Sequence, residues 1–323
     1  MSLFSGAGGL DKGFVKAHYE IVFAVDSDKW AVETHRHAFP HTCSVQADLV
    51  KLGVKRLLDQ IRPLLTQGER IGVIGGPPCQ GFSRSNVTAT ANDPRNKLPM
   101  LYLKIVEALQ TEYAVEFIIF ENVLGIRDSK HERTYDGILR RLNKLGLASN
   151  VNEYDAYDFG VAQHRHRVII AAFASEKACM SFMPTRQIVG KKTVKQVIGK
   201  LPEPSYFCRG MQPNEYHPNH WTMQPRSPRF LNPDEQQGDG RSFRRLNYGE
   251  PSPTVAYGHR EIHVHPNGTR RLSILEAMLL QGFTKKDVLY GPLSAQVQQV
   301  SNAVPPPMAY AMAIAVTHSL TRV

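Results

Sequence analysis

The sequence predicts an α/β fold, in which helices cover both faces of a parallel β-sheet, with a smaller, irregular, β-rich domain attached. Two observations lead to this prediction. In the first half of the 323-residue chain, short apolar segments alternate with segments whose apolar residues recur at helical spacing. After about Met183 this alternation stops, and prolines, aromatic residues and basic residues accumulate.

The predicted strands are short and apolar, and the helices between them are long enough to cross over a sheet. Glycines are expected to end two of the helices, at Gly146 and Gly282. The carboxyl ends of parallel strands share one edge of a sheet, and ligands bind there. The predicted strands are 20–25, 71–75, 115–120 and 168–173, and the predicted helices are 28–39, 54–65, 99–109, 135–145, 273–281 and 308–320.

The change in composition predicts three segments: a first domain over 1–183, a second domain over 184–266, and a more regular segment over 267–323. Between Pro184 and Leu272 there are 14 Lys and Arg residues against 7 Asp and Glu residues. Eight aromatic residues lie among these charges, which are too many for a linker without a core. Basic residues interleaved with aromatic rings suit nucleic acid.

Composition indicates the kind of partner and the cellular location of the protein. The formal net charge of +10 favours a polyanionic partner, although a basic, solvated surface is the alternative. Four scattered cysteines do not make a disulfide framework and indicate a reducing compartment. There is no secretory signal and no run of 18 apolar residues, so the expected location is the cytoplasm, with no membrane partner.

A glycine-rich segment near the start suggests a ligand site. Residues 3–9 read LFSGAGG and precede a helical pattern, so a ligand can approach the backbone and the amino end of the helix. Acidic residues follow the second and third strands, at Asp26 and Asp48, where carboxylates bind hydroxyl groups. No lysine follows the glycines, which argues against a triphosphate.

The strongest local signal is segment 75–83, GGPPCQGFS, which follows a predicted strand. Its prolines stiffen the chain, its glycines allow unusual backbone geometry, and its neighbours are polar. We therefore interpret Cys79 as a nucleophile, although a structural cysteine in a turn is the alternative. Glu121 ends the next strand and is expected to face the same cleft, as a proton donor or as a structural acid.

Segment 163–167, QHRHR, leads into another strand, and period-two alternation places Arg165 and Arg167 on one face. Two arginines there suit a phosphate or a developing negative charge. Histidines at 164 and 166, and the set Cys208, His217 and His220, could suggest a metal. Neither set has four ligands at usual zinc spacings, so no metal is expected.

Taken in order, these motifs resemble those of the DNA (cytosine-5-)-methyltransferases of bacterial or phage type. The late part of the chain agrees, because 270–283 is similar to the family's ninth motif and 301–305 to its tenth. The resemblance covers nearly the whole chain. It implies a Rossmann-like S-adenosylmethionine-dependent methyltransferase sheet, with 1–183 as the catalytic and cofactor-binding domain and 184–266 as the target-recognition domain. Segment 267–323 would return to the catalytic domain. Family members carry more strand residues before the first glycine motif, so a short first strand is expected.

The resemblance also assigns residues. It implies that Cys79 is the nucleophile, that Glu121 contacts ring nitrogen 3 of cytosine, and that Arg165 anchors the flipped base. The cofactor-binding residues would be Phe4, Gly6, Gly8, Gly9, Asp26, Asp48, Pro78 and Asn302, with Asp26 on the ribose and Asp48 on the adenine amino group.

The chemistry requires such residues, because carbon 5 of cytosine is a poor nucleophile. Addition of a thiolate to carbon 6 activates carbon 5, and a hydrogen bond at nitrogen 3 absorbs the charge. A stacked base is out of reach, so it must be flipped out of the duplex.

The resemblance implies a monomer that acts on double-stranded DNA, in the context of a partner restriction endonuclease. Two alternatives remain. A tRNA cytosine methyltransferase usually carries Pro-Phe-Thr after Cys-Gln, where this chain has Gly81-Phe82-Ser83. A catalytically silent DNA-binding protein would be expected to lose Cys79, Glu121 or the glycines, and all are present.

Overall fold

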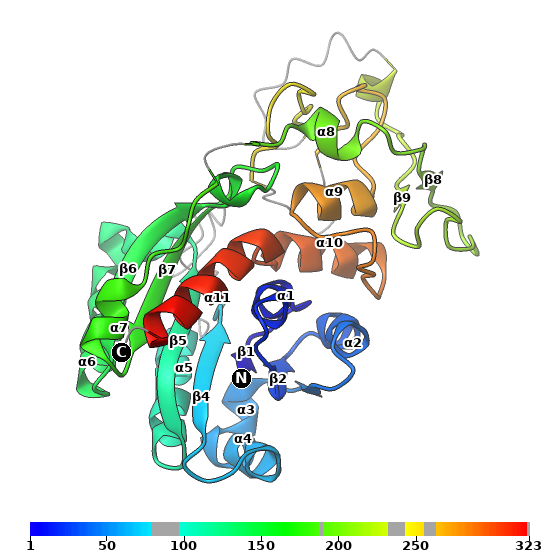
Figure 1. Cartoon of the computed structure of the whole chain (residues 1–323). Coiled ribbons are helices and arrows are strands. Elements are labelled where there is room, and N and C mark those ends of the chain that lie inside the picture. Colours follow the sequence, from blue (N-terminus) through cyan, green and yellow to red (C-terminus); the bar gives the residue numbers. More distant parts are fainter. Residues whose placement is uncertain (79–96, 188–189, 232–242, 255–262, 322–323) are drawn as a thin grey trace. The chain divides into compact units, whose positions relative to one another are not determined.

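The computed structural model describes residues 1–78, 97–187, 190–231, 243–254 and 263–321, which belong to two compact units (Figure 1). The first unit comprises Met1–Asp155, His166–Thr185 and Ala309–Val323. The second comprises Ala156–Arg165 and Arg186–Met308. The second unit therefore extends beyond 184–266 and includes most of segment 267–323, which was expected to return to the first domain. The division into domains with separate roles stays a prediction.

The first unit is built on a seven-stranded sheet in the order β3-β2-β1-β4-β5-β7-β6. Strands β1 to β5 are parallel to one another, and the two-residue β1 pairs with both β2 and β4. The strands are β1 (Ser2–Leu3), β2 (Phe23–Asp26), β3 (Cys43–Gln46), β4 (Arg70–Gly75), β5 (Ala114–Asn122), β6 (Ala148–Asp155) and β7 (His166–Phe173). The α/β prediction and the short first strand are confirmed.

The prediction of an all-parallel sheet is wrong at one end. Strand β7 runs antiparallel to both β5 and β6. Hydrophobic periodicity shows that a segment is a strand but carries no information about its direction. Strand β6 was not predicted, because its sequence ASNVNEYD is mostly polar and only Tyr154 is buried among its eight residues.

Helices cover both faces of this sheet (Figure 1). On one face Tyr102 of α5 packs edge-on against Phe120 at 5.2 Å and donates a hydrogen bond to the Val73 carbonyl at 3.0 Å. On the other face Phe14 of α1 stacks on Phe117 at 6.1 Å. The helices of the unit are α1 (Gly9–Lys16), α2 (Lys29–Ala38), α3 (Leu49–Leu52), α4 (Val54–Ile61), α5 (Leu98–Gln110), α6 (Glu132–Lys144), α7 (Glu176–Ser181) and most of α11 (Pro306–Thr321).

Strand β5 shows how the two layers share the sheet. Ile118 and Phe120 join the core under α4, α5 and α6, whereas Phe117 points to the α1 side. Successive strand residues point to opposite faces, so a strand covered on both sides must be apolar throughout. This explains why 115–120 reads as a continuous apolar run.

The C-terminal helix α11 packs against α1 at a position that requires a glycine. A Cβ atom at Gly13 would lie 2.4 Å from the backbone of Ala309. Tyr19, just after α1, adds a hydrogen bond between its hydroxyl and that of Thr317 at 3.0 Å. The last segment of the chain is thereby fixed against the helix that follows the glycine-rich turn.

Most predicted helices of the first unit occur within a few residues of their expected bounds. Gly146 follows α6 with a φ of 72°, which is the expected left-handed termination. Short 3-10 helices of this unit lie at Arg62–Leu64, Leu124–Arg127 and Ser129–His131.

The second unit has little regular structure in the part of the chain that the structure describes, as expected. Its only sheet there is the parallel pair β8 (Ser205–Tyr206) and β9 (Trp221–Thr222). Its described helices are the 3-10 helices Ala156–Phe159 and Pro228–Phe230, and α8 (Val194–Ile198), α9 (Ile274–Leu280) and α10 (Leu293–Asn302). Helix α9 confirms the segment capped by Ser273, and α10 was not predicted.

A buried polar network holds this irregular unit together. Arg270, 2% exposed, donates two hydrogen bonds to the carboxylate of Glu276, 1% exposed, at 2.9 and 3.0 Å. Glu276 also accepts a hydrogen bond from the Ser273 amide at 2.7 Å and closes the capping box of α9. His220 contacts the Ser273 hydroxyl at 2.9 Å. The Glu276 carboxylate therefore connects Arg270 to the amino end of α9.

Among the described residues, no helix is long and apolar enough to cross a membrane.

We expect Glu276→Ala to lower the free energy of unfolding by about 3–5 kcal/mol, because it leaves the buried Arg270 guanidinium without its main partner. Denaturant unfolding followed by circular dichroism measures the change. The control is Glu112→Ala, which removes the same two-bond geometry from the exposed Arg62–Glu112 pair. Surface pairs contribute little, so the control should change stability far less. Equal losses in the two variants would contradict a structural role for the buried pair.

Candidate active site

The polar residues singled out in the first unit lie where strands β1 to β5 end. The glycine-rich turn follows β1, Asp26 is the last residue of β2, and Asp48 follows β3. Gly76 follows β4, and Glu121 lies near the end of β5. Because these strands are parallel, all of these positions are on one edge of the sheet.

The turn after β1 has the backbone geometry expected of a ligand-binding loop. Phe4, Gly6 and Gly8 have φ angles of 56°, 53° and 80°, and Gly8 is the N-cap of α1. A Cβ atom at Gly6 would meet nothing within 4 Å. The backbone is therefore bare toward open space at Gly6, and the free amide groups at the start of α1 lie directly after it.

Two carboxylates accompany this turn. Asp26 accepts hydrogen bonds from the amides of Gly6 and Asp28, both at 2.9 Å. Burial raises the pKa of Asp26, and these backbone hydrogen bonds oppose the shift. Asp48 caps α3 by accepting a hydrogen bond from the Val50 amide at 2.9 Å with one carboxylate oxygen. Asp26 is bonded to the turn, and Asp48 lies on the same edge of the sheet, after the strand two places from β1. Two carboxylate acceptors on this edge suit a ligand with hydroxyl and amino donors, as a nucleoside-like cofactor has.

The other predicted cofactor residues lie in different parts of the chain. Gly9 is the buried first residue of α1. Pro78 is exposed, three residues after β4. Asn302 is exposed at the end of α10, in the second unit. Cys79 lies outside the described residues, so its role stays a prediction.

Glu121 is held by an ion pair that the sequence analysis did not assign. Its carboxylate lies 2.7 Å from Nε of Arg167, and both side chains are largely buried. Burial lowers the pKa of Arg167, and the adjacent Glu121 carboxylate opposes this shift. The pair joins the end of β5 to the start of the antiparallel β7.

The segment leading to Cys79 runs next to Glu121. A Cβ atom at Gly76 would lie 2.6 Å from Oε2 of Glu121. Asn122, beside Glu121, donates a hydrogen bond to the Pro77 carbonyl at 3.4 Å. Strands β4 and β5 are paired, as the hypothesis of a shared cleft required. A side chain at position 76 would therefore require the Glu121 carboxylate to shift from its present position.

Arg165 and Arg167 have different partners, although they alternate along one face. Arg165 is 1% exposed and donates a hydrogen bond to the Ser301 carbonyl at 2.6 Å within the second unit. Arg167 contacts Glu121 in the first unit. Alternation indicated both arginines, but only the structure shows which of them pairs with the carboxylate.

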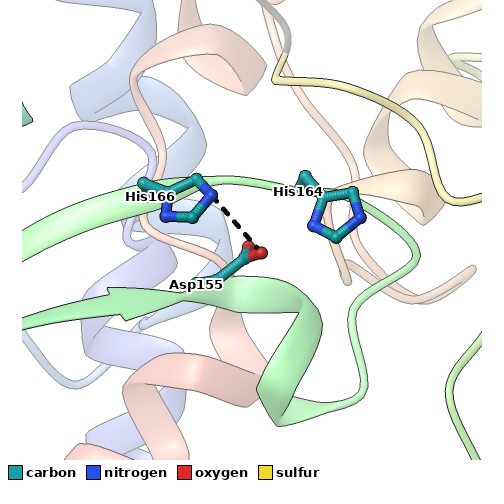
Figure 2. A group of neighbouring side chains, drawn as sticks. All are labelled: Asp155, His164 and His166. Carbon is teal, nitrogen blue, oxygen red and sulfur yellow. Dashed lines mark ion pairs between the residues drawn. The ribbon is translucent and has the colours of Figure 1, made fainter.

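Figure 2 shows His166 facing Asp155 from the paired position on the neighbouring strand, at 3.5 Å. The other ring nitrogen of His166 lies 3.1 Å from Glu153. His164, also drawn, belongs to the second unit, where its ring lies 4.6 Å from that of Tyr157. Carboxylates therefore account for both ring nitrogens of His166. The expectation that the protein binds no metal stays a prediction.

The sheet, the glycine turn and the buried Glu121 beside Gly76 are features of an α/β enzyme with its site at the carboxyl edge of the sheet. The sequence model of the C-5 cytosine-specific DNA methylases matches residues 1–318, and the chain belongs to this family. By class it is a DNA (cytosine-5-)-methyltransferase, and the fold prediction of a methyltransferase sheet is confirmed.

Individual relatives cover the chain almost fully. It is 31% identical to the Type II methyltransferase M1.HphI of Haemophilus parahaemolyticus over 98% of this chain and 86% of the relative. It is 29% identical to M.FnuDI of Fusobacterium nucleatum over 99% and 94%. A solved structure of a putative DNA modification methyltransferase encoded within an E. coli prophage shares the fold, with a TM-score of 0.78, 23% identity and coverage of 99% and 98%.

We expect Gly76→Ala to displace the Glu121 carboxylate and to lower methyl transfer by about 100-fold, because a misplacement of about 1 Å at a reacting centre costs about that much. A radiolabelled transfer assay measures the rate, and a crystal structure of the variant locates Glu121. The control is Gly137→Ala on α6, where a Cβ atom would meet nothing within 4 Å. A Gly76→Ala enzyme with normal activity would show that Glu121 does not need its present position.

Proposed function

We propose that this chain transfers a methyl group from S-adenosylmethionine to carbon 5 of cytosine in a specific double-stranded DNA sequence. The observation that carries this proposal is the Glu121–Arg167 pair beside Gly76 and Pro77, in the segment that leads to Cys79. Glu121 is thus a fixed hydrogen-bonding group beside the residues that precede Cys79 in the chain, which supports the proposal.

The turn after β1 and the two carboxylates would hold the cofactor. Bound S-adenosylmethionine supplies an electrophilic methyl group on a positively charged sulfur. Asp26, already fixed by two backbone amides, would accept hydrogen bonds from the ribose hydroxyls. Asp48 would bind the adenine amino group, and Phe4, Gly6, Gly8, Gly9, Pro78 and Asn302 would shape the rest of the site.

The residues near Glu121 would activate the base. The Cys79 thiolate would form a bond to carbon 6, which moves electron density toward carbon 5 and nitrogen 3. Glu121 would hydrogen-bond nitrogen 3 and stabilise the charge that develops there. After transfer, the proton on carbon 5 would leave to a base and the thiolate would be eliminated, so the enzyme would be restored.

Arg167 would orient Glu121 during this reaction. Its Nε contacts one carboxylate oxygen of Glu121, which fixes the direction of the other oxygen. Arg165 would be an anchor beside the flipped base, as the family resemblance implies. These are separate roles, because the two arginines have different partners.

The second unit would recognise the DNA. The guanidinium groups of Arg229 and Arg271 lie over the aromatic ring of Phe243, with their Cζ atoms 5.1 and 4.8 Å from its centroid. Phe243 has a φ of 67°, a strained value for a non-glycine residue, and such strain gathers at functional sites. Arg226 and Arg244 are exposed, and no hydrogen bond or ion pair of their side chains is recorded in the described part of the chain. These two are our candidates for phosphate contacts.

The named relatives are Type II methyltransferases, which supports a restriction-modification context for this chain. We propose that it acts as a cytoplasmic monomer and protects DNA against a partner endonuclease. Methyl transfer compared on duplex DNA and on tRNA tests the substrate class. Modification of tRNA alone would overturn the proposal.

We expect Cys79→Ser to abolish methyl transfer and to leave cofactor binding largely intact, because Cys79 attacks the base and does not hold the cofactor. Duplex DNA with 5-fluorocytosine at the target should trap the wild-type protein, because fluorine cannot leave as a proton does. A denaturing gel detects the adduct. An active wild-type enzyme without an adduct would exclude Cys79 as the nucleophile.

We expect Arg226→Gln and Arg244→Gln to weaken binding to all duplexes alike. Each lost phosphate contact should reduce the slope of log affinity against log salt by about 0.9. Fluorescence anisotropy over a salt series measures the slope. Arg140→Gln, at an exposed position on α6 of the first unit, is the control and should leave the slope unchanged. Unchanged slopes in both test variants would place the phosphate contacts elsewhere.

A further inference from the structure

A buried chain of hydrogen bonds lies behind the glycine turn, and the proposed mechanism does not use it. Nε2 of His35 lies 3.3 Å from Oδ1 of Asp11, and Nδ1 of His35 lies 2.8 Å from Oγ of Ser44. Asp11 and His35 are both 0% exposed. The three residues come from α1, α2 and β3, so this chain links three elements around one imidazole ring.

The imidazole ring of His35 touches the turn itself. A Cβ atom at Gly8 would lie 3.0 Å from Cδ2 of His35 and 2.4 Å from Cε2 of Phe39. The two rings lie against each other, with centroids 4.5 Å apart. Gly8 therefore packs against the rings of His35 and Phe39, and its backbone is in the left-handed conformation with a φ of 80°.

Simple packing does not explain why a histidine and an aspartate stand here. An apolar ring would fill the same space without the cost of burying polar groups. Oδ2 of Asp11 is buried and has no hydrogen-bond partner among the residues that the structure describes. A buried polar atom of this kind is rare in folded proteins and calls for a reason beyond packing. The hydrogen bonds at both ring nitrogens fix the tilt of the ring, and the ring supports Gly8.

We propose that His35 is a positioning residue for the cofactor, held by Asp11 and Ser44 so that its ring fixes the turn at Gly8. The inference rests on the proposed function, because it takes the turn at 4–9 as the cofactor-binding site. The Gly8 carbonyl accepts a hydrogen bond from the Lys12 amide, and the Gly8 amide donates one to the Ser5 carbonyl. Because of these two bonds, fixing Gly8 also fixes Gly6 and the first amides of α1. If the His35 ring were no longer held, the turn could adopt other conformations. Binding would then have to order the turn, and the affinity for the cofactor would fall.

The test compares His35→Leu with His35→Gln by calorimetric titration of S-adenosylmethionine into the full-length protein. Leucine removes both hydrogen bonds, so we expect the dissociation constant to rise at least tenfold. Glutamine can donate to Asp11 and accept from Ser44, so it should stay within about threefold of wild type. In turnover assays, His35→Leu should raise KM for the cofactor and leave kcat nearly unchanged at saturation.

The matched control is His37→Leu on the same helix, because His37 is half exposed and does not face the turn. It should bind the cofactor as wild type does. Ser44→Ala removes one hydrogen bond and keeps the ring, so it should weaken binding by a few-fold even if His35→Leu does not fold. An affinity within twofold of wild type for folded His35→Leu, or for Ser44→Ala when His35→Leu does not fold, would overturn the inference.

Asp26→Ala separates this inference from the proposed function. If Asp26→Ala weakens binding and His35→Leu does not, the cofactor site is correct and only the role of His35 fails. If Asp26→Ala also binds normally, the cofactor lies elsewhere and the proposed site fails. A lower melting temperature with normal affinity in His35→Leu would show a purely structural role and would likewise overturn the inference.

Discussion

The parallel pairing of β1 with its two neighbours is the constraint on which the site depends. Strand β1 has only two residues, yet it pairs with both β2 and β4 and occupies the middle of the first five strands. Because β1 to β5 run in one direction, the chain leaves every one of them at the same edge of the sheet. The glycine turn, two carboxylates, the segment before Cys79 and Glu121 are collected there by backbone geometry alone.

The one reversed strand of the sheet serves the same edge. An antiparallel strand brings its start, and not its end, to the place where its neighbour finishes. Register pairs Asn122, at the end of β5, with Val168, near the start of β7. Arg167 therefore precedes a paired residue at the edge where Glu121 stands, and the 2.7 Å ion pair becomes possible. A parallel strand in this position would have carried the arginine to the opposite edge. The departure from the predicted topology thus supplies a partner that the all-parallel sheet could not.

Periodicity and motif spacing predicted the parts of the molecule in which local sequence decides structure. The apolar runs at β4 and β5, the cap at Ser273 and the glycine end of α6 were found because one short segment determines each of them. Strand β6 was missed because its pairing with β7, and not its own polar sequence, makes it a strand. The Glu121–Arg167 pair and the support of Gly8 by His35 were missed for the same reason. Each joins residues separated by more than 25 positions, and a single sequence does not display such contacts.

The two arginines of segment 163–167 show how recognition and chemistry can be coupled. Arg165 ends a segment of the second unit, where it is bonded to the Ser301 carbonyl, and His166 begins a segment of the first. Two residues of extended chain span only about 7 Å, so Arg165 cannot move far without pulling on Arg167. Arg167 in turn holds Glu121, the proposed contact to the base. Covalent continuity therefore links a residue anchored in the second unit to Glu121, the residue proposed to contact the base. A loop inserted between Arg165 and Arg167 would leave the partners Ser301 and Glu121 unchanged in the chain. It would remove the short covalent connection between the two arginines.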